Sequence, residues 1–158
     1  MQTATAIWIV LAALSTAVVG GVYLGFSAMV MPAFDGDARS TGVMNRINVL
    51  APRSPFILAF LVSALACGVS IVLVLVDLMA GATAAWAALV AVAGAVLGLA
   101  GFVITAAVNV PLNNRLAEAA PGDNAAFAAF EKPWRKANSA RGAVSLAGAA
   151  ALMTSLLG

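Results

Sequence analysis

The chain of 158 residues has no histidine and a single cysteine, Cys67. The lack of histidine excludes haem, zinc, copper and iron sites built on histidine, as well as a Cys–His dyad, and a lone cysteine excludes an intrachain disulfide. Charged residues make up only 9% of the chain, against roughly 25% in an ordinary soluble domain. A net charge of +2 without a basic groove interleaved with aromatics argues against a nucleic-acid partner.

Apolar residues dominate instead. They make up 63% of the chain and give a mean hydropathy of +1.05. A helix needs about 20 mainly apolar residues to cross roughly 30 Å of hydrocarbon, and four stretches meet or approach that length: 6–31, 55–78, 84–108 and 134–157. The sequence therefore predicts one all-α integral membrane domain over residues 1–158, a four-transmembrane-helix up-down-up-down bundle. The first span lacks the positively charged start of a secretory signal, and we expect it to be retained.

The loops between the predicted spans differ in length and charge. Residues 32–54 are expected to contain a short interfacial helix over 41–50, and residues 79–83 form a tight turn that makes spans two and three an antiparallel hairpin. The fourth helix is expected to begin near Pro133, with the proline in its first turn. Three basic residues lie in the first loop and five in or beside the third. The positive-inside rule then predicts cytoplasmic first and third loops, with both termini outside.

Small residues four apart occur within three of the spans. Such pairs let helix backbones approach closely in lipid, and the candidate pairs are Gly21 and Gly25, Gly94 and Gly98, and Ala143 and Ala147. Their spacing predicts a compact bundle. The pairs can join helices of one chain or of two, so a homo-oligomer is one possible outcome.

Polar side chains also lie at helical spacing inside the apolar stretches. The stripes are Thr16, Gly20, Tyr23 and Ser27; Thr105, Asn109 and Asn113; and Trp134, Asn138, Arg141 and Ser145. A desolvated guanidinium needs acceptors, so we expect Arg141 to turn inward and meet Asn109, Asn113 or a bound anion. In the first loop, Asn45 and Asn48 share a helical face. Together these stripes predict a polar pocket under the two cytoplasmic loops.

Each of these residues also has a purely structural interpretation. Serine and threonine within spans commonly bond to their own helix backbone. Tyr23 and Trp134 suit an interfacial aromatic belt, and Arg141 can extend to a lipid phosphate. Asn109 can mark a helix end or kink. Asp77, at the outer end of span two, is expected to be a solvated boundary charge.

Three segments carry a more specific pattern. Residues 109–113 read Asn-Val-Pro-Leu-Asn, residues 134–141 have the spacing Trp-x3-Asn-x2-Arg, and residues 44–48 read Met-Asn-Arg-Ile-Asn. This pattern resembles the anthrone oxygenase-like family of small four-span membrane proteins, and the resemblance extends over essentially the whole chain. It implies a protein of the bacterial inner membrane that oxidises an anthrone to an anthraquinone with dioxygen and without a metal or organic cofactor.

That chemistry suits a chain without histidine, because a deprotonated anthrone is an enolate that can pass an electron to dioxygen directly. Donors for the developing oxygen anion are expected to be Arg141, Arg46, Asn109 and Asn113. Trp134 can stack on a planar ring, and Asn45, Asn48 and Asn138 complete the expected substrate-binding set. The general base is either Tyr23 or a loop carboxylate, the candidates being Asp35, Glu118 and Glu131.

Two other functions compete with the enzyme. A non-catalytic membrane module or accessory subunit would bind a quinone-like lipophilic molecule in the same pocket. A small solute or drug transporter ranks last, because coupling needs an ionisable residue near the bilayer midplane and none lies there. The partners predicted in all are a lipophilic small molecule and the lipid bilayer, with dioxygen added for the enzyme.

Overall fold

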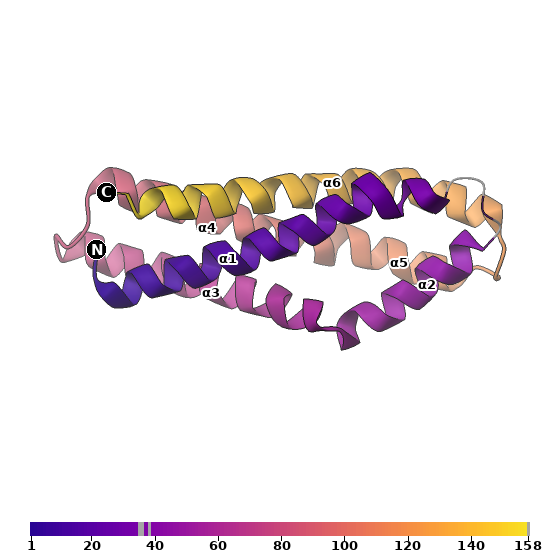
Figure 1. The fold of residues 1–158 in the computed structure, drawn as a ribbon, viewed down its shortest axis with the longest axis horizontal. Helices are drawn as coiled ribbons and strands as arrows, with labels where there is room; N and C mark the ends of the chain where they lie inside the picture. Colours follow the sequence, from indigo (N-terminus) through magenta and orange to yellow (C-terminus); the bar gives the residue numbers. More distant parts are fainter. Residues whose placement is uncertain (35–36, 38, 158) are drawn as a thin grey trace.

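The computed structural model describes residues 1–34, 37 and 39–157 (Figure 1). Asp35, one of the expected proton acceptors, lies outside the described residues. Within them the chain forms helices and no strand, as predicted for an all-α protein. The α-helices are α1 (Thr3–Gly25), α2 (Ser40–Leu50), α3 (Pro55–Met79), α4 (Ala85–Ile104), α5 (Val110–Ala117) and α6 (Asn124–Ser155).

Three helical segments are long and apolar enough to cross a membrane: Thr3–Phe34, Pro55–Met79 and Ala85–Ala117. Large apolar side chains cover their outer surfaces, such as Leu58 and Leu65 on α3, which are more than half exposed. Apolar exposure on this scale indicates contact with lipid. α6 is 32 residues long, but it carries charged residues in its first half and is less apolar, so the count of four spans stays a prediction.

The long helices contact one another in a ring. α6 packs against α1 and α4, and α3 packs against the same two helices. Both termini and the turn between α3 and α4 lie at one end of the molecule, whereas α2, α5 and the first turns of α6 lie at the other (Figure 1). The segments that carry the basic residues are thereby gathered at one end.

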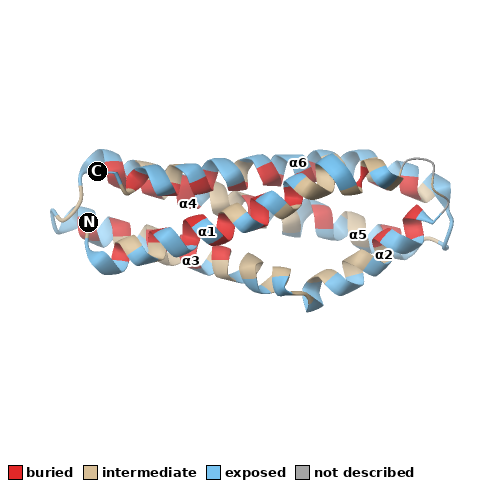
Figure 2. Cartoon of the chain, in the orientation of Figure 1, coloured by how far each residue is buried: buried red, intermediate tan, exposed pale blue. Residues whose placement is uncertain are grey.

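Close packing concentrates toward the end that holds the termini, where buried residues lie along the facing sides of the helices (Figure 2). The fully buried side chains there include Ile9, Val74 and Leu152. A Cβ atom added to Gly148 would lie 2.7 Å from the Gly94 carbonyl oxygen. Only glycine permits such an approach, so α4 and α6 meet backbone to backbone.

The predicted seams of small residues are only partly used within the chain. Gly94 and Gly98 do face other helices, because a Cβ at Gly98 would lie 2.8 Å from the Cys67 sulfur on α3. Gly21 has open space around it, and Ala143 and Ala147 are exposed. The α6 glycine that lets the backbones of α4 and α6 approach is Gly148, and the two alanines are not part of this contact.

Two π-helical turns, Phe26–Val30 and Thr105–Asn109, interrupt the long helices. The second joins α4 to α5, and Pro111 lies in the first turn of α5, where its missing N–H is tolerated. Asn109 is thus a point of altered helical geometry, not the end of the helix. Such turns occur often at functional sites because they redirect side chains.

The start of α6 differs from the prediction. The helix begins at Asn124, and the Asp123 carboxylate accepts a hydrogen bond from the Ala126 N–H at 2.9 Å. This N-cap satisfies one of the free N–H groups of the first turn. Pro133 lies inside the helix, so the predicted start near Pro133 is wrong; the Asp123 cap fixes an earlier beginning.

Asp77 is also placed differently from the prediction. It is only 2% exposed, and its carboxylate accepts a hydrogen bond from the Gln2 N–H at 2.8 Å. The N-terminal amino group contacts the Ala82 carbonyl beside it. A carboxylate at the start of α1 satisfies a free backbone N–H and complements the helix dipole. The prediction of a solvated boundary charge is therefore wrong.

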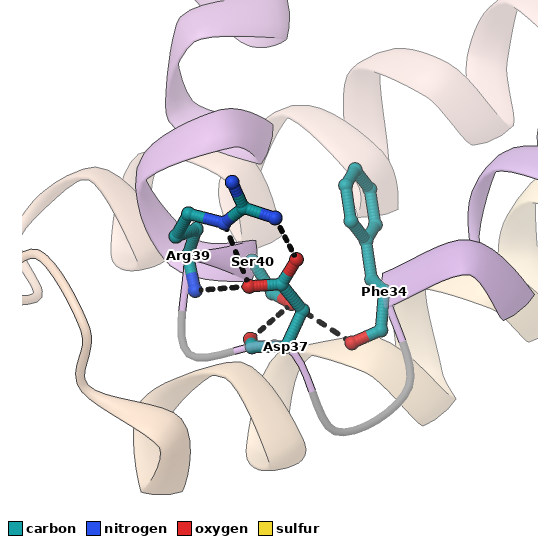
Figure 3. A network of polar contacts seen from close by, with 4 residues as sticks. All are labelled: Phe34, Asp37, Arg39 and Ser40. Atoms are coloured by element: carbon teal, nitrogen blue, oxygen red, sulfur yellow. Dashed lines mark hydrogen bonds and ion pairs between the residues drawn. The ribbon is translucent and has the colours of Figure 1, made fainter.

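The chain enters α2 through a small polar network (Figure 3). The Asp37 carboxylate accepts hydrogen bonds from the Arg39 backbone N–H at 2.8 Å and from its guanidinium at 2.8 and 3.1 Å. These bonds lower the pKa of Asp37 to about 2. The Ser40 hydroxyl donates to the Phe34 carbonyl at 2.8 Å, which ties the start of α2 to the preceding turn.

Candidate functional site

Arg141 on α6 is a buried cation, 7% exposed. Its Nε and Nη2 donate to the Asn138 carboxamide oxygen at 3.1 and 2.7 Å, and its Nη1 donates to the Thr105 hydroxyl at 3.0 Å. The guanidinium carbon lies 3.9 Å from the centre of the Tyr23 ring. No carboxylate among the described residues pairs with it. A buried guanidinium normally has an anionic partner, so this one is prepared to receive an anion.

Thr105, in the second π-helical turn, links the arginine to the tyrosine. Its hydroxyl donates to the Gly101 carbonyl at 2.9 Å. A hydroxyl has one proton to donate, so Thr105 accepts from Arg141 and also from the Tyr23 hydroxyl, 3.3 Å away. The Tyr23 proton is therefore directed toward Thr105, and the phenol oxygen keeps lone pairs for another donor.

Asn138 orients the guanidinium. It is completely buried, and its carboxamide nitrogen donates to the Tyr23 carbonyl and to the Ser27 hydroxyl, both at 2.7 Å. With the nitrogen bound to α1, the oxygen faces Arg141. Because Arg141 turns inward, the alternative interpretation that it extends to a lipid phosphate is not supported. Tyr23 and Trp134 are each only 3% exposed, which argues against a place in an interfacial aromatic belt.

The amides on the π-helical turn and on α5 bind Trp134, not the arginine. Trp134 donates from its indole nitrogen to the Asn113 oxygen at 2.8 Å, and its carbonyl accepts from the Asn109 side chain at 3.3 Å. The expected meeting of Arg141 with Asn109 or Asn113 is therefore wrong. α5 brings these amides to α6 about two turns before Arg141, within reach of the indole.

Two cavities meet at Arg141. One, of about 290 Å³, has mostly apolar walls from α1, α2, α3 and α6. The other, of about 570 Å³, lies beneath α2 and α5. The residues that line both are Tyr23, Ala51, Phe56 and Arg141. Tyr23 and Arg141 are the only titratable residues among the described ones on these walls, and the volumes are typical of small-molecule sites.

Aromatic rings of α3 line one side of the larger cavity, and their stacked row continues to Phe102, which is not part of the lining. Phe56 and Phe60 on α3 stack with ring centres 6.1 Å apart, and Phe60 stacks on Phe102 at 4.7 Å. Tyr23 meets Phe56 edge to face at 5.9 Å. Sequence analysis missed these phenylalanines, although the spacing of four between Phe56 and Phe60 places them on one helical face. A planar aromatic ligand fits such a wall.

The remaining predicted site residues divide into two groups. Asn45 and Asn48 on α2 line the larger cavity with Asn113. Arg46, between them, is exposed and borders a separate hollow with Arg39. A residue between two inward-facing positions of a helix points away from them, so Arg46 lies outside the site.

The loop carboxylates stay away from the cavities. Glu118 is exposed just beyond the end of α5, and Glu131 pairs with Arg135 at 3.6 Å. Neither lines a cavity beside Arg141. These two candidate bases are therefore not brought to the site by the fold.

The fold and the site together define a helical membrane protein with a partly open, aromatic-walled cavity that a buried cation lines. Residues 42–151, well over half of the chain, match the family model of the anthrone oxygenase. The chain therefore belongs to the anthrone oxygenase family. The matched region includes Thr105, Asn138 and Arg141, whereas Tyr23 precedes it. No curated protein and no solved structure matches the chain.

Proposed function

We propose that this protein binds an anthrone or a related planar hydroxyaromatic in the joined cavities and promotes its oxidation to a quinone by dioxygen, without a cofactor. The observation that carries the proposal is the buried Arg141 guanidinium, which has no carboxylate partner among the described residues and lines an aromatic-walled cavity. Membership of the anthrone oxygenase family supports the same chemistry.

The proposed reaction begins with loss of a proton from the doubly benzylic carbon. This leaves an enolate whose negative charge lies mainly on the former carbonyl oxygen. The enolate passes one electron to dioxygen, and the resulting carbon radical and superoxide join to form a carbon–oxygen bond. The peroxide takes up a proton; its O–O bond then breaks as the same carbon loses its remaining hydrogen, releasing water and leaving a second carbonyl. The balance is anthrone plus dioxygen to anthraquinone plus water.

Arg141 supplies the main effect in this proposal. Three of its five N–H groups are bound to Asn138 and Thr105, which leaves two to donate to the enolate oxygen. A fixed donor aimed at a developing oxyanion contributes about 2.7–4 kcal/mol to lowering the barrier. Tyr23 and Asn138 hold the guanidinium in place, so it need not reorganise during the reaction.

The site offers no general base of the usual kind. Its described titratable residues are Arg141 and Tyr23, and the tyrosine already donates its own proton to Thr105. We therefore assign proton loss to the acidity of the substrate, with water as the acceptor and Arg141 shifting the equilibrium toward the enolate. The rate should rise with pH as the bound substrate ionises.

The deciding experiment measures catalysis directly. Purified, metal-stripped protein in lipid nanodiscs is mixed with anthrone, and quinone absorbance and oxygen uptake are recorded together. We expect acceleration over empty nanodiscs, with one dioxygen consumed per quinone formed. A rate equal to the spontaneous oxidation in empty nanodiscs would remove the enzymatic proposal for this substrate.

A second candidate function is a non-catalytic module that holds a quinone-like molecule. The absence of carboxylates from the described walls of both cavities favours it, because binding needs no proton acceptor. Quenching of tryptophan fluorescence by anthraquinone, with no acceleration of anthrone oxidation, would support this function over the enzyme.

We further propose that the cavities lie in the cytoplasmic leaflet of a bacterial inner membrane, with both termini outside. The support is the gathering of basic segments at the end that contains α2 and α5 (Figure 1). In a Cys67→Ser background, single cysteines at Thr3 and Asp123 should react with a membrane-impermeant thiol reagent from outside and inside, respectively. The opposite pattern would invert the orientation.

A further inference from the structure

We propose that Asn45 and Asn48 form a second polar subsite, which binds a neutral hydroxyl group on the edge of the ligand remote from the oxygen held by Arg141. This inference rests on the proposed function and narrows its substrate class. The ligand would be a planar polycyclic aromatic with two oxygen substituents, one that becomes anionic and one that stays neutral.

The two asparagines line the larger cavity, and each has one buried polar atom beside it that is unused. The Asn45 carboxamide nitrogen donates to the Leu116 carbonyl at 3.1 Å, which fixes the orientation of the amide. Its oxygen is buried without a partner among the described residues, and so is the carboxamide nitrogen of Asn48. Buried polar atoms are almost always hydrogen-bonded in folded proteins. Five buried side-chain atoms of the described residues lack a partner, and Asn45 and Asn48 are the two of these residues that line the cavities beside Arg141.

A hydroxyl group matches the unused pair, because it donates one hydrogen bond and accepts others. It can donate to the Asn45 oxygen while it accepts from the Asn48 nitrogen. Asn45 and Asn48 are three residues apart on α2 and line the same cavity, so their amides can reach one atom. Both amides are neutral, and no described titratable residue other than Tyr23 and Arg141 lines this cavity, which favours a neutral substituent over a charged one.

Arg141 and the two asparagines occupy different parts of the cavity lining. Arg141 lines both cavities, whereas Asn45 and Asn48 line only the larger one. Phe56 and Phe60 form the aromatic wall of that larger cavity. A flat ring system lying against this wall would direct one edge toward α6 and another toward α2.

The test uses quinones, which bind without being turned over. Binding of 9,10-anthraquinone, 2-hydroxyanthraquinone and 1-hydroxyanthraquinone is measured by tryptophan quenching in nanodiscs. The 2-hydroxyl points outward from the ring edge, whereas the 1-hydroxyl bonds to the neighbouring carbonyl. Two hydrogen bonds of ordinary strength correspond to about a tenfold gain, so we expect the wild type to prefer the 2-hydroxy compound over anthraquinone about tenfold and to gain little from the 1-hydroxyl.

Asn48→Leu should reduce the preference for the 2-hydroxy compound to about twofold, while affinity for unsubstituted anthraquinone holds or rises. Asn48→Ala removes the donor without adding an acceptor and should reduce the preference as well, which covers the case in which the leucine variant fails to fold. The matched control is Asn124→Leu, at an exposed position at the start of α6, which should keep the full preference.

The outcomes separate this inference from the proposed function. If both Asn48 variants keep the wild-type preference, or if the wild type shows none, the subsite is overturned even where anthrone oxidation is accelerated. If no quinone binds and anthrone oxidation is not accelerated, the proposed function fails and the subsite fails with it.

Discussion

The two halves of this molecule are both built from helices, but one is closely packed and the other contains cavities. In the half that contains the termini, which we call the packed half, glycine brings α4 and α6 into backbone contact and small residues fill the core. In the half that contains α2 and α5, the cavity half, a second buried cluster includes large aromatic side chains such as Phe127, Phe130 and Trp134, and two cavities lie beside it. Close packing supplies stability, whereas the looser half supplies space for a ligand.

The polar groups differ between the halves in the same way. In the packed half the buried carboxylate of Asp77 is used to hold the start of α1. In the cavity half Asn45 and Asn48 each keep one unused polar atom, Arg141 keeps two N–H groups without a partner among the described residues, and all three residues line a cavity. Buried polar groups that keep unmet bonding capacity cost stability. Their retention beside a cavity is what a binding site requires.

The largest expected effect removes the cation of the cavity half. Arg141→Met should lower the rate of anthrone oxidation about 10²- to 10³-fold, because the enolate oxygen loses its fixed donor. Initial rates of quinone formation measure the loss, and circular dichroism checks that the helices persist. Arg135→Met, on the same helix but outside both cavities, is the matched control. Equal losses in the two variants would contradict the role of Arg141.

In the packed half, a single methyl group added where α4 and α6 meet should lower the stability of the protein. Gly148→Ala places a Cβ 2.7 Å from a backbone oxygen of α4, and relieving that overlap should cost about 1–3 kcal/mol of unfolding free energy. Gly21→Ala, where space is open, should be neutral or stabilise by up to about 1 kcal/mol. Unfolding by SDS titration compares the two, and equal stabilities would show that α4 and α6 do not meet closely.

Substitutions of Thr105 test whether its hydroxyl positions Arg141 in the cavity half. Thr105→Val keeps the shape of the side chain but removes the acceptor for Arg141 and Tyr23, so kcat should fall about tenfold, the effect of one lost hydrogen bond to a charged group. KM should change little, because Thr105 acts on the reaction through Arg141, and valine keeps the size of the side chain in the cavity lining. Thr105→Ser should restore most of the rate; a serine variant as slow as valine would argue for a packing effect alone.

Tyr23 separates anion binding from base catalysis. Tyr23→Phe keeps the ring under the guanidinium and removes only the long 3.3 Å bond to Thr105. We expect no more than about a threefold loss of rate, and an unchanged rise of rate with pH. A loss of 10²-fold or more would instead identify the tyrosine as the general base and overturn our assignment of proton loss to the substrate.

The smallest effect belongs to the exposed loop that leads into α2. The pKa of Asp37 is about 2 in the folded protein and 3.8 without its partner. The Asp37–Arg39 pair therefore contributes above about pH 4, and its contribution is lost as the pH falls toward 2. Arg39→Gln should return the Asp37 pKa toward 3.8 in a carboxyl NMR titration, while stability at neutral pH barely changes because the pair is exposed. An Asp37 pKa that is the same in this variant as in the wild type would show that the Asp37–Arg39 pair does not form.

The sequence predicted the helices better than their contacts. The first three predicted spans agree with observed helices to within a few residues, because long apolar runs carry a strong signal. The start of α6 was missed. The nine helical residues before Pro133 are mostly alanine and phenylalanine, and their composition alone did not show that they extend the helix. A proline at a helix start and one inside a helix look alike in sequence.

The candidate site was predicted in outline and altered in detail. Helical spacing placed Trp134, Asn138 and Arg141 on one face, and all three are buried. Spacing within one helix says nothing about which amide on another helix meets them, so the partners of Arg141 were wrongly chosen. The stacked row of Phe56, Phe60 and Phe102, of which the first two line the larger cavity, was not predicted for the same reason, since two helices contribute to it.

By itself the sequence determined that this is a helical membrane protein of one family, with its polar groups toward one end, because composition and periodicity are local properties of the chain. Only the tertiary structure decided that Arg141 is left without an anionic partner among the described residues, that Asp77 binds the start of α1, and that two cavities share Arg141 as a lining residue. Those facts depend on which helix faces which, and that is settled by packing between residues far apart in the chain.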